Sequence, residues 1–217
     1  MVLLVNKQTV LEFFRIFIEG YILKDLDKLK SIQPDTNTGL GGCTIPTAML
    51  ILSSMDLFGF LLNKEGKTDS SKDNILFFID FDDFFPHYYK GKNGAIYTKE
   101  KLYNYRHGMM HHFFPKFKGE FAGICKNTDS TSLFIPIQIN DKFEESLNVS
   151  LFASDFINAT GKLKEYLLNC DDEDVFGMII GKLKDLDYYI QISSTTTTCT
   201  TSNPGTPQKR REKNLIK

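Results

Sequence analysis

The segment at residues 44–62, TIPTAMLILSSMDLFGFLL, most constrains what this chain can fold into. It is apolar on nearly every side of a helix, so a surface position would leave apolar side chains in water. Such a segment either spans a membrane or forms the central helix of a bundle. Asp56, near its middle, would cost about 2.5–3.5 kcal/mol in a bilayer. We therefore expect a buried central helix that begins near Pro46, because proline is tolerated in a first helical turn.

Helical spacing of apolar residues extends over most of the chain. Residues 8–30 show it clearly, and the turn-rich stretch 31–42, SIQPDTNTGLGG, separates them from the central segment. The aromatic-rich segment 74–91 has a composition that suits a strand or a helix, and we interpret it as a helix ended at Pro86. Further helices are expected over residues 98–114, 153–169 and 172–190.

Residues 120–152 interrupt this helical pattern. The stretches 120–127 and 132–140 indicate two short strands joined by a polar turn, and 147–152 indicates a third. From Ser193 the chain is Thr-rich, almost without apolar residues and basic near its end, a composition typical of disorder. The sequence thus predicts a mainly α fold with two parts. These are one helical-bundle domain at 1–192, with a small β-hairpin or three-stranded insertion near 120–152, and a disordered tail at 193–217.

Charge and cysteine content narrow the classes of function. A formal net charge of −1 excludes a generally basic nucleic-acid coat, so any contact with nucleic acid needs a local patch. The four cysteines are scattered, with no C-x-x-C pair: Cys43, Cys125, Cys170 and Cys199. This pattern is typical of free thiols in a reducing compartment. The first residues also lack the features of a signal peptide, so we expect a cytoplasmic protein.

Three of the four histidines fall in one stretch, NYRHGMMHHFFPKF at residues 104–117. On a helix at about 100° per residue, Arg106 falls near the middle of the apolar stripe. An unpaired buried guanidinium costs several kcal/mol, and the carboxylate of Asp56 has the same problem inside the apolar helix. We therefore expect the two to meet, or both to line one polar cleft. As a structural alternative, they would form a buried ion pair that sets the register of two helices.

The histidines of this helix divide between two faces. His107 and His111 are four residues apart and share one edge of the apolar stripe, whereas His112 points toward the polar face. Gly108 costs roughly 1 kcal/mol relative to alanine inside a helix, and the usual reason is close approach by a backbone or a ligand. These features predict a cleft in which Arg106 can hold a phosphate while a histidine carries a proton.

The run Arg106-His107-Gly108-Met109-Met110-His111 resembles the R-x4-6-H motif of the HEPN superfamily, in which the residue after the arginine is commonly Asn, Asp or His. HEPN proteins are helical bundles, typically dimeric, and many are metal-independent RNA endonucleases of toxin–antitoxin, phage-defence and RNA-processing systems. The resemblance covers the motif helix and, more loosely, the apolar helices before it. It does not account for the strands expected at 120–152.

The resemblance implies a reaction that this chain's residues can perform. RNA cleavage without a metal needs a base for the 2′-OH proton and a cation for the charge that develops on the phosphate. His111 is then expected to be the general acid or base, Arg106 to hold the scissile phosphate, and His107 to orient the pair or the substrate.

Binding residues and partners follow from the same resemblance. Tyr103 and Tyr105 are candidates for stacking on bases, with core packing as the alternative for Tyr103, and Asp56 is expected to line the cleft. The implied partners are single-stranded RNA, a second copy of the chain and a cognate antitoxin protein, with no cofactor, no metal and no membrane contact.

Two other functions stay open. His107 and His111 have the spacing of two zinc ligands on one helix, although Gly108 stands where an H-E-x-x-H motif has its glutamate. A third ligand would come from one of three residues: Asp56, Cys43 or His87. The other alternative is a non-catalytic HEPN-like binding or scaffold module in a defence or toxin–antitoxin system. The surroundings of His111 separate these functions, since a ligand-ready histidine faces a cleft and a structural one bonds to a backbone carbonyl.

Overall fold

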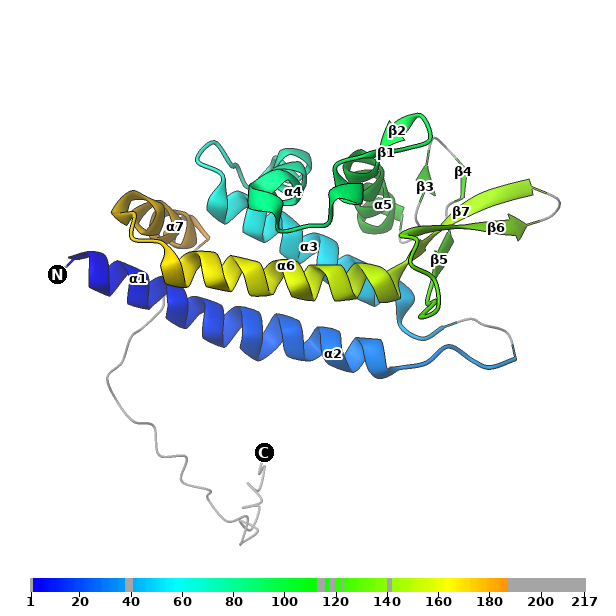
Figure 1. The fold of residues 1–217 in the computed structure, drawn as a ribbon, viewed down its shortest axis with the longest axis horizontal. Helices are drawn as coiled ribbons and strands as arrows, with labels where there is room; N and C mark the ends of the chain where they lie inside the picture. Colours follow the sequence, from blue (N-terminus) through cyan, green and yellow to red (C-terminus); the bar gives the residue numbers. More distant parts are fainter. Residues whose placement is uncertain are drawn as a thin grey trace, which may run out of the picture.

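The computed structural model describes residues 2–37, 41–112, 116–117, 120–121, 123–139 and 142–186. The fold is mainly α, with a small three-stranded sheet and a two-stranded hairpin in the C-terminal half, which confirms the predicted fold class (Figure 1). The tail predicted at 193–217 lies outside the described residues, as does the C-terminal end of the helix predicted at 172–190.

The first helices form one continuous rod (Figure 1, blue). It consists of α1 (Val2–Phe13), the π-helix η1 (Phe14–Leu23) and α2 (Lys24–Ser31). The helix predicted at 8–30 is therefore confirmed, although its middle third is wound as a π-helix. In this π-helix Phe14, Ile18 and Ile22 are buried at four-residue spacing, so the apolar face continues from α1 into α2.

The helix α3 (Thr44–Leu62) occupies the centre of the bundle, as predicted. It packs against α2, α4, α5, α6 and α7, and its apolar residues on all sides therefore find partners. Among the described helices, α3 is the one that is long and apolar enough to cross a membrane, yet 61% of its apolar stretch is buried inside the bundle. Burial of this kind is what the core helix of a soluble protein shows.

The segment after α3 is less regular than predicted. The helix α4 (Ser71–Asp80) ends before the predicted stop at Pro86, because Asp82 and Asp83 both take left-handed backbone conformations with φ of 42° and 51°. The break turns Phe84 and Phe85 back into the core. The elements that follow are η2 (Phe81–Asp83), η3 (His87–Tyr89) and an unpredicted hairpin of β1 (Lys92–Asn93) and β2 (Ile96–Tyr97), leading into α5 (Thr98–His112).

The β region also differs from the prediction in its pairing. Its strands are β3 (Lys116–Phe117), β4 (Glu120–Phe121), β5 (Gly123–Cys125), β6 (Phe134–Ile139) and β7 (Lys142–Asn148). In the three-stranded sheet β7 is central, antiparallel to β6 and parallel to β5, so the first two predicted strands do not pair with each other. The third strand predicted at 147–152 is wrong beyond Asn148, whose side chain accepts a hydrogen bond from the Ser150 amide and begins a helix.

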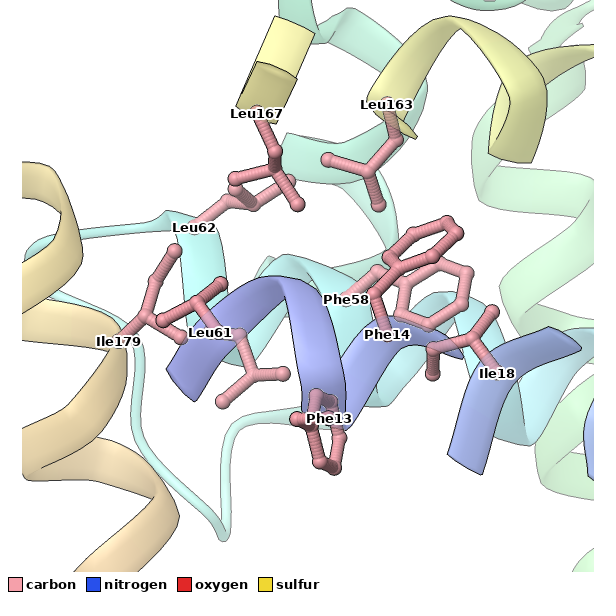
Figure 2. A pocket seen from close by; sticks show the side chains of 10 residues that line it. Phe13, Phe14, Ile18, Phe58, Leu61, Leu62, Leu163, Leu167 and Ile179 are labelled. Atoms are coloured by element: carbon pink, nitrogen blue, oxygen red, sulfur yellow. The ribbon is translucent and has the colours of Figure 1, made fainter. Parts of the chain in front are cut away.

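The last two helices complete the bundle. They are α6 (Val149–Asn169), which lies beside the α1–α2 rod, and α7 (Glu173–Asp185), which packs on α1 and α3 (Figure 1). Apolar side chains from α1, η1, α3, α6 and α7 surround a cavity of about 20 Å³ (Figure 2). It has room for about one water molecule but offers that molecule no polar partner. We therefore interpret it as a packing defect and not as a ligand site.

Candidate functional site on helix α5

The helix α5 is held in place by its buried face. Leu102, Tyr105 and Met109 are at most 1% exposed, and α5 packs against α3 and α4. The Tyr105 hydroxyl donates to the Glu145 backbone oxygen of β7 at 3.1 Å, and Lys101 forms an ion pair with the Glu145 carboxylate. These contacts fix α5 between the bundle and the sheet, so its outer residues project from a rigid support.

Arg106 lies at an edge of this buried face, and not at its middle as expected from the helical projection. Met110, which was expected on a second apolar side of Arg106, is 47% exposed. The buried stripe instead centres on Leu102, Tyr105 and Met109. A projection cannot distinguish the two sides of Arg106, because both carry apolar residues and only the neighbouring helices decide which one is covered.

Arg106 and Asp56 meet, as predicted. The Arg106 Nη2 lies 3.2 Å from the Asp56 Oδ2, and the two side chains are 19% and 17% exposed. The other carboxylate oxygen of Asp56 accepts a hydrogen bond from the Asn74 Nδ2 at 2.9 Å. The same Asn74 nitrogen donates to the Lys67 backbone oxygen at 2.9 Å. Asp56 is thus held from both sides, by α5 and by α4.

The position of Asn74 depends on a close approach of two helices. A Cβ atom on Gly59 would lie 1.8 Å from the Asn74 backbone oxygen, so only glycine permits α3 and α4 to be this close. Asn74 is 1% exposed and begins the buried face of α4. The sequence analysis missed Asn74, and the available signal was the lone glycine in the apolar helix, which marks a close approach but not its partner.

Two polar atoms of this cluster have no hydrogen-bond partner among the described residues. They are the Arg106 Nε and the Asn74 Oδ1, both buried. Each unmet buried group costs about 1–3 kcal/mol, and such groups in a folded protein call for a functional or structural reason. The guanidinium therefore has donor capacity that Asp56 does not use.

His107 and His111 lie together on the outer surface of α5. Their ring centroids are 4.5 Å apart with the planes inclined at 49°, and both residues are exposed. The half-buried Tyr103 lies on the same edge, with its ring centroid 6.1 Å from that of His107. Neither imidazole forms a hydrogen bond with a described residue, so no backbone carbonyl in the described part of the chain holds His111.

One protomer does not bring Arg106 and His111 together. They are five positions apart, which corresponds to about 140° around a helix. The guanidinium turns inward to Asp56, while the imidazole of His111 lies on the exposed side. The structure therefore pairs Arg106 with Asp56, and His107 with His111, but leaves these two pairs on different faces of α5.

The two tyrosines proposed to stack on bases differ in access. Tyr103 is half-buried beside His107, whereas Tyr105 is 1% exposed and packs against Phe134 with ring centroids 5.8 Å apart. Burial also raises the pKa of the Tyr105 hydroxyl above its usual value. Tyr105 therefore serves core packing here, and Tyr103 is the tyrosine of this pair that a ligand can reach.

The three candidate third metal ligands do not join the histidine pair. Asp56 is engaged by Arg106, Cys43 directly precedes α3, and His87 lies in η3. Over the described part of the chain, no group of three His, Cys, Asp or Glu side chains is placed to hold a metal ion. The position of His112 in α5 is described, but its side chain is not.

A second polar cluster, built on the buried Asp155, joins α6 to η3. The Asp155 carboxylate accepts hydrogen bonds from the hydroxyls of Tyr88 and Tyr89, the latter at 3.0 Å. Burial raises the pKa of Asp155 above its usual value, although the two hydroxyl donors oppose that rise. The sequence analysis missed this cluster, because Asp155 follows a run of small and apolar residues in no recognisable motif.

Comparison with known proteins adds no family or fold assignment. No protein-family model, no curated protein sequence and no solved structure matches this chain.

Proposed function

We propose that this chain is a metal-independent RNA endonuclease of HEPN type that acts as a homodimer. The observation that carries the proposal is that α5 bears an exposed His107–His111 pair and, on another face, a half-buried arginine whose Nε has no partner among the described residues. His111 acts as general acid or base, His107 orients it or the substrate, and Arg106 binds the scissile phosphate. RNA and a cognate antitoxin protein are the proposed partners, in the cytoplasm.

The chemistry needs only groups that α5 presents. A neutral imidazole removes the 2′-OH proton, the 2′ oxygen attacks phosphorus, and the bond to the 5′ oxygen breaks. A protonated imidazole gives that leaving oxygen its proton, which leaves a 2′,3′-cyclic phosphate and a 5′-hydroxyl end. Arg106 neutralises charge on the phosphate as it develops. His111, which the neighbouring His107 orients, carries both protons in turn, first as base and then as acid.

The separation of Arg106 and His111 around α5 makes the dimer part of the proposal. Two α5 helices that face each other across a two-fold axis present the histidines of one protomer to the arginine of the other. The exposed Met110, next to His111, gives this face an apolar contact residue. Single-stranded RNA would enter the groove between the two helices, with Tyr103 available to stack on a base.

A non-catalytic binding module is the second candidate. The Arg106–Asp56 pair favours it, because a guanidinium already engaged by a carboxylate serves packing without any substrate. In this case the α5 face still binds RNA or a protein partner, but no bond is broken.

The test is cleavage of a mixed single-stranded RNA pool in EDTA by the wild type, Arg106→Ala and His111→Ala. Arg15→Ala and His87→Ala are controls, since both residues are exposed and belong to other elements, η1 and η3. We expect cleavage by the wild type and both controls, with loss in the two α5 variants. Absence of cleavage by folded, dimeric wild type would favour the binding module instead.

Mixing the two inactive variants tests the dimeric arrangement. If Arg106 and His111 act across the two-fold axis, a mixed dimer has one intact site. Random exchange then restores about a quarter of the wild-type rate. No recovery after verified subunit exchange would refute a site shared between protomers.

A further inference from the structure

The exposed His107–His111 pair has a capability that proton transfer does not require. Both imidazoles belong to one rigid helix, four residues apart, with ring centroids at 4.5 Å. The backbone beneath them is fixed by the buried side chains of Leu102, Tyr105 and Met109. Two neutral imidazoles held at this spacing form a ready-made pair of nitrogen ligands.

The distances suit a first-row transition metal ion. Two bonds of about 2.0–2.1 Å at a tetrahedral angle require the two nitrogens to be about 3.3 Å apart. Exposed imidazoles with centroids at 4.5 Å reach that separation by side-chain rotation, with no movement of the helix. Nitrogen donors select zinc, copper or nickel ions, whereas magnesium and calcium require oxygen ligands.

We propose that His107 and His111 chelate a divalent transition metal ion such as Zn²⁺ or Ni²⁺, one nitrogen each, with water at the other positions. Within the described part of the chain no third protein ligand is placed beside them, so the site differs from a closed structural zinc site with four protein ligands. The ion is held reversibly at the surface and keeps open coordination positions.

The consequence for activity rests on the proposed function. A metal ion that occupies the ligating nitrogens of His107 and His111 removes the base that takes the 2′-OH proton. The ion therefore switches RNA cleavage off, in contrast to the metal-dependent hydrolases in which it generates the nucleophile. Removal of the ion by a chelator restores the free imidazoles.

The test is calorimetric titration of the full-length protein with NiCl₂, in a buffer without chelators. The proteins compared are the wild type, His107→Ala and His111→Ala, with His112→Ala and His87→Ala as controls. His112 lies on the same helix but outside the four-residue pair, and His87 is exposed in η3. The two site residues are exposed, so their replacement leaves the core intact, and circular dichroism verifies the fold.

We expect Ni²⁺ affinity to fall at least about tenfold in both site variants, since even loss of a group that only hydrogen-bonds to a metal ligand lowers affinity over that range. The control variants should bind as the wild type does. Equal affinity in His111→Ala, or equal loss in either control, would overturn the proposal. Because binding is measured without RNA, an inactive protein that still shows this pattern refutes the nuclease and leaves the metal site standing.

Discussion

Replacing Gly59 with alanine tests the close approach of α3 and α4 on which the position of Asn74 depends. The new Cβ would lie 1.8 Å from a backbone oxygen, whereas ordinary contacts begin at 3.4 Å. The helices must therefore separate by roughly 1.5 Å, since a backbone atom cannot rotate away. Overpacking of this kind costs about 3 kcal/mol, and better helix propensity returns at most about 1 kcal/mol. We expect a net loss of about 2 kcal/mol.

Urea denaturation followed by circular dichroism measures this loss as a change in midpoint at constant slope. Gly161→Ala is the matched control, because Gly161 lies in α6 with no neighbouring atom within 4 Å of an added Cβ. There the substitution should stabilise the protein by about 0.5–1 kcal/mol. If Gly59→Ala is as stable as Gly161→Ala, α3 and α4 do not approach as described and the placement of Asn74 beside Asp56 fails with it.

Three further substitutions test the polar contacts. Asp56→Ala leaves the half-buried guanidinium of Arg106 unpaired and should lower the free energy of unfolding by about 1–3 kcal/mol. The double variant Asp56→Ala/Arg106→Met should recover part of this loss, and an equal loss in the single and double variants would exclude the pair. Asn148→Ala removes the cap of α6 and the hydrogen bond from its Nδ2 to the Asn127 oxygen at 2.9 Å, and urea titration should show a loss of about 2–3 kcal/mol. Because the pKa of Asp155 is raised, the folded protein binds more protons than the unfolded chain above about pH 4, and wild-type stability should fall relative to Asp155→Asn as pH rises. If the stability of the wild type relative to Asp155→Asn instead rises between about pH 4 and pH 7, the raised pKa is contradicted.

The features predicted well were those set by strong local constraints. An apolar segment that tolerates no exposed side can only be central, so the helix at 44–62 was predictable from composition alone. The Arg106–Asp56 contact was predictable for a related reason, since two charges on apolar helices each need a partner. The start of α7 was also marked locally: the Asp172 side chain accepts a hydrogen bond from the Asp174 amide, at the acidic run before the helix.

The features missed depend on contacts between distant residues. The parallel pairing of β5 with β7 has no local signature, because β7 lies between strands that follow one another in the sequence. Asn148 is the last residue of β7, as the predicted strand at 147–152 requires, but the hydrogen bond from the Ser150 amide also makes it the cap of α6, which the sequence pattern did not indicate. The helical projection also placed Arg106 at the centre of its stripe, since only packing decides that Met110 is left exposed.

The most direct test of the account is cleavage of one RNA oligonucleotide and its all-2′-deoxy counterpart by full-length wild-type protein in EDTA. The account predicts that the RNA alone is cut, that its fragments carry 2′,3′-cyclic phosphate and 5′-hydroxyl ends, and that His111→Ala cuts neither strand. Cleavage of the all-2′-deoxy oligonucleotide as well as the RNA, or cleavage by His111→Ala at the wild-type rate, would contradict a metal-free mechanism that uses the 2′-OH and the histidines of α5.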